Sequence, residues 1–165
     1  MIIVSNTSPL TNLAAIKRFD LLQRLYGELH IPVAVWDELN SGGKVWPGRD
    51  EVADAVWIHR VECANEPLIT ALMRDLDRGE AESIALAVEL EADLVLLDER
   101  EGRRAAQRLE LRVLGVVGIL LQAKSAGLLS TVRPELDALR QIAGFYLSAA
   151  VYEKALKLAE EFPVD

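Results

Sequence analysis

The chain has few of the features that mark a secreted, disulfide-bonded or membrane-inserted protein. Its single cysteine, Cys63, excludes an intramolecular disulfide and a zinc site built from several cysteines. The start, MIIVSN, lacks the basic region and the long apolar core of a signal peptide. The longest strongly apolar stretch, 113–121, contains two glycines and falls short of the roughly 20 residues of a spanning helix. We therefore expect a cytoplasmic protein without a membrane segment.

Positive charge is also scarce. The chain has 18 lysines and arginines against 26 aspartates and glutamates, for a formal net charge of −8. Because proteins hold polyanions mainly through cations that neutralise phosphates, this balance argues against a protein that coats nucleic acid, and any such contact must be local. The sequence contains no P-loop, no GxSxG motif, no persuasive Ser/His/Asp order and no internal repeat.

The pattern of apolar residues predicts strands that alternate with helices. With 165 residues the chain is long enough for one domain that buries about two-thirds of its unfolded surface. Alternating elements indicate a three-layer α/β/α sandwich with a mostly parallel central sheet. We expect residues 1–130 to form this α/β domain and residues 131–165 to form a helical extension packed on it. The predicted strands are 2–4, 29–31, 56–61, 94–97 and 112–114.

The stretch 77–100, DRGEAESIALAVELEADLVLLDER, predicts a capped helix that leads into a buried strand. Asp77 and Glu80 have capping-box spacing, and Glu80 heads the apolar stripe of that helix. Glu82 aligns instead with Glu89, so of the two glutamates it is the one expected to face water. On this basis Glu80→Gln is predicted to weaken metal binding more than Glu82→Gln.

Two polar residues follow predicted strands directly. Asn6 ends the first strand and Asp98 ends the strand at 94–97, so both are expected at the carboxyl edge of the sheet, where open α/β sheets bind ligands. Ser8 before Pro9 predicts a helix that is capped by the serine and begins at the proline.

Four oxygen-bearing side chains are candidates for one site at this edge: Asn6, Glu38, Glu80 and Asp98. Oxygen ligands in octahedral geometry suit Mg²⁺ or Mn²⁺, which polarises a phosphodiester and activates water. Each side chain also has a purely structural explanation. Glu80 closes a capping box, Asp98 follows a strand into a turn, Glu38 is near a helix end, and Asn6 suits an Asx turn.

A basic run follows Asp98. It consists of Arg100, Arg103, Arg104, Arg108 and Arg112. One interpretation is a phosphate-binding edge in which Arg100, Arg103 and Arg104 contact nucleic acid; the other is a solvated helix face that balances nearby glutamates. His30 and His59 lie in predicted strands and are assigned to packing or to the surface.

Four motifs in order resemble the PIN-domain family. They are VSNTSPL at the start, IPVAVWDEL after the second strand, GEAESIALAVELEADLVLLDER in the middle and LRVLGVVGILLQAKSAGL near residue 120. The chain is most similar to prokaryotic PIN-like proteins akin to the VapC-type toxin ribonucleases. The resemblance implies a site in which four acids bind Mg²⁺ or Mn²⁺ and cut single-stranded RNA. Motif for motif, the catalytic positions are Asn6, Glu38, Glu80 and Asp98, with Asn6, Glu80 and Asp98 as metal ligands and Thr7, Ser8 and Glu82 in support.

The sequence departs from this family at Asn6, where an active PIN ribonuclease typically has aspartate. An amide oxygen can ligate a metal but brings no charge. Two functions therefore stay open: a metal-dependent endoribonuclease, or a PIN fold with weak or no catalysis that binds RNA or a protein. A receiver-like or phosphatase-like domain ranks last, because the first strand lacks the aspartate it needs. If the protein is a toxin, the resemblance implies an antitoxin partner and a homodimer.

Overall fold

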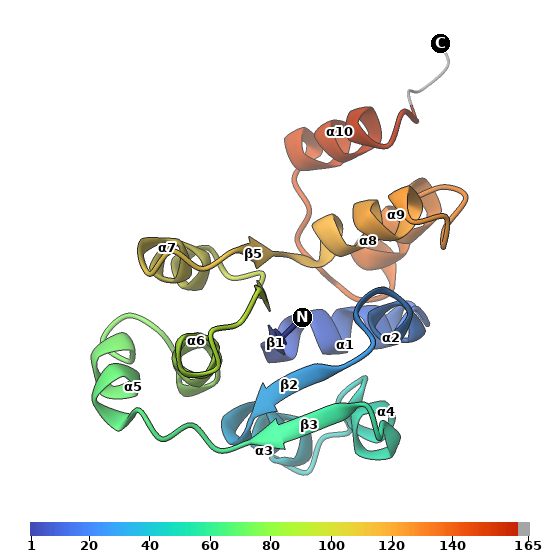
Figure 1. Cartoon of the computed structure of the whole chain (residues 1–165). Helices are drawn as coiled ribbons and strands as arrows, with labels where there is room; N and C mark the ends of the chain where they lie inside the picture. The colour runs from blue at the N-terminus through green and yellow to red at the C-terminus, as the bar shows by residue number, and fades with distance from the viewer. Residues whose placement is uncertain (162–165) are drawn as a thin grey trace.

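A five-stranded parallel sheet forms the centre of the computed structural model, which describes residues 1–161 (Figure 1). Its strands are β1 (Ile3–Ser5), β2 (Leu29–Pro32), β3 (Ile58–Val61), β4 (Leu94–Leu96) and β5 (Val113–Leu114). They lie in the order β3-β2-β1-β4-β5, and each neighbouring pair is parallel. Because the strands are parallel, their carboxyl ends all lie at one edge of the sheet. The segments that follow the neighbouring strands β1 and β4 therefore start side by side.

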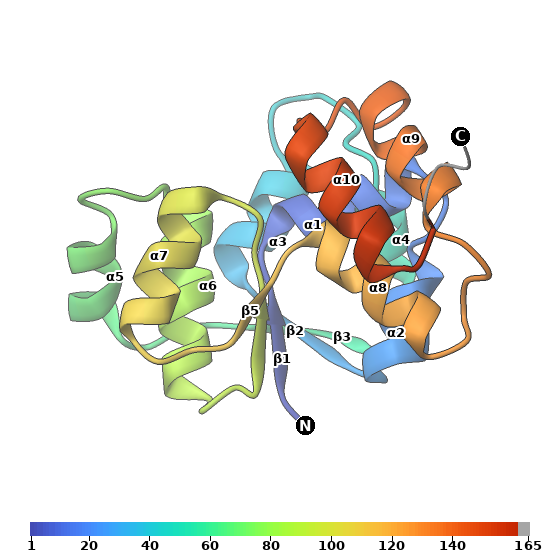
Figure 2. The same cartoon turned by 90° about the horizontal axis from the view of Figure 1, so that it is seen from above.

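Helices cover both faces of the sheet, which gives the predicted three layers (Figure 2). The helices before β4 are α1 (Thr7–Ala15), α2 (Asp20–Tyr26), α3 (Val33–Asn40), α4 (Arg49–Asp54), α5 (Glu66–Leu72) and α6 (Arg78–Glu89). Those after it are α7 (Arg100–Arg108), α8 (Val116–Ser125), α9 (Arg133–Gln141) and α10 (Ala149–Leu158). Because successive strand residues point to opposite faces, Ile3 packs with α1, α2 and α8, whereas Val4 packs with α5, α6 and α7. The α/β/α prediction is confirmed.

Several element boundaries differ from the predicted ones. Ser8 is not an N-cap: α1 begins at Thr7 after an extended Asn6, whose backbone N–H still bonds Leu96 O in the sheet at 2.9 Å. The chain therefore leaves the sheet and enters the helix within one residue, which leaves the Ser8 hydroxyl available to other partners. Pro32 is the last residue of β2 and the N-cap of α3, so this strand also leads directly into its helix.

The glycine-rich composition of residues 40–50 predicts a loop over that whole stretch, but the observed loop covers the shorter range 41–48. Helix α4 begins at Arg49, because Gly48 adopts a left-handed conformation (φ 92°) that ends the loop. Val52 of this short helix is 3% exposed and joins the main hydrophobic cluster. Because Val52 is the one buried residue named for α4, the sequence shows no apolar periodicity from which this helix could be predicted.

The C-terminal helices share a hydrophobic cluster with the start of the chain. Leu136 and Leu156 belong to the same cluster of buried side chains as Leu10 and Leu21. Gly144, at φ 68°, separates α9 from α10. The last four residues of the predicted extension, 162–165, lie outside the described residues. Among the helices of residues 1–161, none is long and apolar enough to cross a membrane.

Candidate functional site

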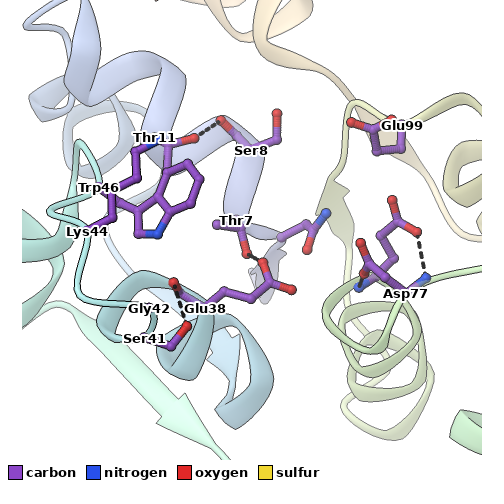
Figure 3. Close-up of a pocket in the computed structure, with 12 residues that line it drawn as sticks. Thr7, Ser8, Thr11, Glu38, Ser41, Gly42, Lys44, Trp46, Asp77 and Glu99 are labelled. Atoms are coloured by element: carbon purple, nitrogen blue, oxygen red, sulfur yellow. Dashed lines mark hydrogen bonds between the residues drawn. The ribbon is translucent and has the colours of Figure 1, made fainter.

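A cleft of about 650 Å³ opens at the carboxyl edge of the sheet (Figure 3). We call it the carboxylate cleft, and its lining residues are Asn6, Thr7, Ser8, Thr11, Glu38, Ser41, Gly42, Lys44, Trp46, Asp77, Glu80 and Glu99. They come from α1 and the residue before it, from α3 and the loop after it, from the start of α6 and from the segment between β4 and α7. Three of the four predicted catalytic side chains, Asn6, Glu38 and Glu80, therefore share one cleft, together with the predicted supporting residues Thr7 and Ser8.

Asp98 lies at the same edge but not among the residues that line the cleft. Strands β1 and β4 are parallel neighbours with Ser5 opposite Leu96, so the prediction that Asn6 and Asp98 lie at the same edge of the sheet is confirmed. The Asp98 carboxylate accepts hydrogen bonds from the Ser8 hydroxyl at 3.1 Å and from the Val116 N–H at 2.8 Å. In this arrangement it caps the start of α8 and ties β4 to α1.

Glu38 reaches the cleft from the last turn of α3. The Thr7 hydroxyl donates a short hydrogen bond to its carboxylate, as Figure 3 shows. Burial raises the pKa of Glu38, and the nearby Asp77 carboxylate raises it further, while the Thr7 hydrogen bond opposes both. A Cβ on Gly79 would collide with Glu38 Oε1, so the glycine provides the room that lets Glu38 approach the first turn of α6.

Glu80 is held by the predicted capping box, which is confirmed. Its carboxylate accepts the Asp77 N–H at 3.1 Å, and the Asp77 carboxylate accepts the Glu80 N–H at 2.8 Å. Burial, followed by repulsion from Asp77, raises the pKa of Glu80 to about 7, and the carboxylates of Glu99 and Glu38 add to the rise. The Glu80 carboxylate therefore both caps α6 and has a raised pKa.

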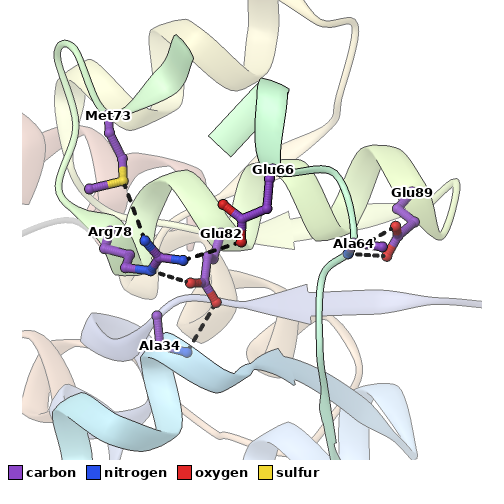
Figure 4. A network of polar contacts seen from close by, with 7 residues as sticks. All are labelled: Ala34, Ala64, Glu66, Met73, Arg78, Glu82 and Glu89. Carbon is purple, nitrogen blue, oxygen red and sulfur yellow. Dashed lines mark hydrogen bonds and ion pairs between the residues drawn. The ribbon is translucent and has the colours of Figure 1, made fainter. Parts of the chain in front are cut away.

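The expectation that Glu82 faces water is wrong. Its residue is only 6% exposed, because α3 and α5 pack on the side of α6 that the periodicity assigned to solvent. Arg78 Nε donates to its carboxylate at 2.7 Å, and the Ala34 N–H donates at 3.2 Å (Figure 4). Glu82 therefore connects α6 to the start of α3 and does not line the carboxylate cleft.

Glu82→Gln is expected to lower the free energy of unfolding by about 1 kcal/mol, because a neutral amide makes weaker hydrogen bonds to Arg78 and to the Ala34 N–H. Urea denaturation of the two proteins measures the difference. Glu153→Gln is the control, since Glu153 is an exposed helical glutamate, whereas Glu89 of the same helix as Glu82 itself accepts the Ala64 N–H at 3.2 Å. An unfolding midpoint for Glu82→Gln equal to that of the control would contradict this role.

The predicted arginines divide into two groups. Arg100 and Arg103 line a separate groove beside Asp98, and the positive charge of Arg103 works against the burial that raises the pKa of Asp98. Arg104 instead pairs with Glu101 at 3.6 Å on the surface of α7. The structure thus brings two of the three predicted nucleic-acid contacts to one place.

Sequence reasoning missed several residues of the carboxylate cleft. Glu99 contributes a carboxylate directly after Asp98, and Lys44 and Trp46 come from the loop after α3. In Figure 3, Lys44 and Trp46 lie on one side of the cleft, with Asp77 and Glu99 on the other. The Lys44 ammonium is 4.0 Å from the Trp46 ring centroid, a cation–π contact. A glycine-rich loop has no periodicity from which such placement could be predicted.

The donors in the carboxylate cleft have the chemistry that a hard dication prefers. Asn6 offers an amide oxygen and Glu38, Glu80 and Glu99 offer carboxylates. Crowded carboxylates raise one another's pKa, and a bound dication would relieve that repulsion. As placed, no three His, Cys, Asp or Glu side chains within residues 1–161 form a group that could hold a metal ion. The donor types fit such an ion, but the side chains would have to move closer together to surround it.

The stability of the metal-free protein is expected to depend on pH through Glu80. Its pKa is about 7 when folded, against an ordinary value of 4.5, so between these values the folded state holds a proton that the unfolded state releases. The free energy of unfolding should therefore fall as the pH rises from about 4.5 to about 7. Urea denaturation at several pH values, with a chelator present, should show a shallower fall for Glu80→Gln. Equal slopes for the two proteins would contradict the assignment.

Comparison with known proteins agrees with the fold. A family model described as a PIN domain (DUF3368) matches residues 2–161, nearly the whole chain. A search of curated proteins finds no match. PIN domains have a nuclease-type fold and generally use divalent metal ions and bind nucleic acids. With the parallel five-stranded sheet and the ordered motifs, the match shows that the chain belongs to the PIN-domain family.

Proposed function

We propose that the protein is a divalent-metal-dependent nuclease that cuts single-stranded RNA in the carboxylate cleft. The observation that carries the proposal is the cleft itself, where Asn6, Glu38, Glu80 and Glu99 arrive from four separate segments at the sheet edge. A purely structural capping role for Glu80 accounts for its hydrogen bonds to Asp77. It does not account for the presence of Asn6, Glu38 and Glu99 in the same cleft.

Asn6, Glu38 and Glu80 are the residues that would hold the ion. A bound Mg²⁺ or Mn²⁺ would polarise a phosphodiester and supply an activated water. Thr7 orients the Glu38 carboxylate by donating to it, and Gly79 leaves space for that carboxylate beside α6. The ion would compete with the proton on Glu80, so binding should strengthen as the pH approaches the pKa of about 7 from below.

Asp98 has a positioning role in this proposal. To ligate the ion directly, as the family pattern implies, it would have to exchange the hydrogen bonds that it accepts from Ser8 and Val116. As placed, it fixes Ser8 on the cleft wall and the start of α8. Glu82 supports the site in a similar indirect way by joining α6 to α3.

The resemblance to VapC-type ribonucleases supports a finer proposal, in which the protein is the toxin of a toxin–antitoxin pair. Its substrate would then be cytoplasmic RNA, its partner a small antitoxin protein, and its assembly a homodimer. Asn6 favours a second candidate function. With an amide in place of a carboxylate, the cleft could bind an ion too weakly for efficient cutting, and the protein would then act as a module that binds RNA or a protein.

A cleavage assay on labelled single-stranded RNA tests the proposal. We expect slow cleavage in Mn²⁺ that a chelator stops, and a loss of roughly a hundredfold in rate for Glu38→Gln, the size expected when one electrostatic group of a site is removed. Asp37→Asn is the matched control, because Asp37 is exposed on the same helix and does not line the carboxylate cleft.

Two results would go against the nuclease. Cleavage that persists in chelator would exclude dependence on a metal ion. Cleavage that is equally fast in Glu38→Gln and the wild type would exclude this cleft. Absence of cleavage in the wild type together with RNA binding would favour the second candidate function.

A further inference from the structure

A second groove, of about 590 Å³, lies between the start of α7, helix α8 and the segment that joins α9 to α10. We call it the basic groove. Its cationic side chains are Arg100, Arg103 and Lys154, and Asp98 is the one carboxylate among the described residues that line it. Within residues 1–161 none of these three cations takes part in an ion pair. In a chain of net charge −8, such a local excess of positive charge is a candidate polyanion site.

The basic groove continues into the carboxylate cleft. A hollow of about 360 Å³ between them shares Ser8 and Glu99 with the cleft and shares Asp98, Phe145 and Tyr146 with the basic groove. The three depressions therefore form one track across the sheet edge and onto the C-terminal helices. A linear polymer in the cleft would extend along this track.

The charges along the track differ in sign. Four carboxylates, those of Glu38, Asp77, Glu80 and Glu99, line the cleft against the single cation Lys44. Without a bound dication such a cleft repels phosphates, so a polyanion that binds the metal-free protein must gain its affinity elsewhere. The basic groove is the adjoining place with the opposite sign.

Tyr146 gives the basic groove an aromatic platform. Its residue is 87% exposed, so burial in the core does not explain it. The backbone on either side is fixed: the Phe145 N–H donates to Leu139 O at 2.8 Å, and Arg140 donates to Leu147 O at 2.7 and 3.1 Å. A rigid segment that presents an exposed ring beside cations is suited to stacking on an unpaired base, because little conformational entropy is lost on binding.

We propose that the basic groove binds the segment of single-stranded RNA that flanks the cut site. Arg100, Arg103 and Lys154 contact its phosphates, and one unpaired base stacks on Tyr146. The strand then passes over the connecting hollow into the carboxylate cleft. The proposal rests on the proposed function for the cut itself, while the binding can be measured without cleavage.

The test is fluorescence anisotropy with a labelled single-stranded RNA of about 12 nucleotides in a chelator, which prevents metal-dependent cutting. Tyr146→Ala should weaken binding by roughly tenfold, and Tyr146→Trp should restore it. Lys154→Ala should lower the slope of log affinity against log salt concentration by about 0.7, the value for one phosphate contact on a single strand. Lys157→Ala is the matched control, because Lys157 is exposed on α10 outside the groove.

The outcomes separate this proposal from the nuclease proposal. Weaker binding in Tyr146→Ala and a smaller salt slope in Lys154→Ala support the groove even if the wild type cuts nothing. Unchanged affinity and slope in both variants overturn it even if the wild type cuts RNA, and would leave the groove to a protein partner. Absence of RNA binding by the wild type also overturns it. Equal urea midpoints for the Tyr146 variants and the wild type would show that any loss of RNA binding is not caused by unfolding of the variant.

Discussion

Asn6→Asp is expected to raise the affinity of the carboxylate cleft for Mn²⁺ by about tenfold to a hundredfold and to speed the cleavage of RNA. The change adds one charged oxygen at a position where the amide oxygen now accepts a long contact, 3.5 Å, from the Ser83 hydroxyl. A charge-assisted contact contributes about 1 to 3 kcal/mol, which corresponds to that gain in affinity. Calorimetry with Mn²⁺ measures the affinity, and a labelled RNA measures the rate.

The fold should accept this substitution. Asn6 is the N-cap of α1, a position that favours aspartate because its carboxylate interacts well with the helix dipole. The added charge is nevertheless buried near Glu38 and Glu80, so the metal-free variant should be less stable than the wild type, and Mn²⁺ should restore its stability.

Asn40→Asp is the control for the added charge itself. Asn40 is exposed at the end of α3 and does not line the carboxylate cleft, so this variant should bind Mn²⁺ as the wild type does. Full cleavage by the wild type, with no gain in Asn6→Asp, would show that an amide and the existing carboxylates suffice.

Glu80→Gln is expected to weaken Mn²⁺ binding by about tenfold to a hundredfold, whereas Glu82→Gln should leave the affinity near that of the wild type. Glu82 is a close control for Glu80. Both are buried glutamates in the first turns of α6, but only Glu80 lines the carboxylate cleft. Calorimetry on the two variants separates a ligand from a structural carboxylate.

The two glutamates should also differ in folding. Glu82→Gln weakens the contacts to Arg78 and Ala34 and should lower stability, whereas Glu80→Gln removes a carboxylate that burial makes costly to ionise. An equal loss of Mn²⁺ affinity in both variants, or a larger loss in Glu82→Gln, would mean that the ion binds on the other side of α6.

The sheet edge could be predicted because its causes are local. A short apolar run followed by a polar residue marks the end of a buried strand, and this pattern correctly predicted that Asn6 and Asp98 lie at the same edge of the sheet. That their two strands are neighbours could not be predicted from it. The capping box of Asp77 and Glu80 could be predicted for the same reason, since both partners lie within one helical turn.

The position of a residue could not be predicted from local sequence where its neighbours come from distant segments of the chain. The helical period gives the direction of Glu82 relative to Glu80, but not that α3 and α5 cover that side. The orientation of Asp98 depends on the start of α8, 18 residues later in the chain. Glu99, Lys44 and Trp46 reach the carboxylate cleft through turns and a loop, where the sequence carries no period.

The central claim is that the carboxylate cleft holds a divalent ion, and a crystal structure with Mn²⁺ tests it most directly. Anomalous scattering locates Mn²⁺ without reference to activity. We predict one anomalous peak within ligand distance of Asn6, Glu38 and Glu80, absent from crystals of Glu80→Gln soaked in the same way. A map with no peak in the cleft at millimolar Mn²⁺, or with the peak beside Glu82, would contradict the account.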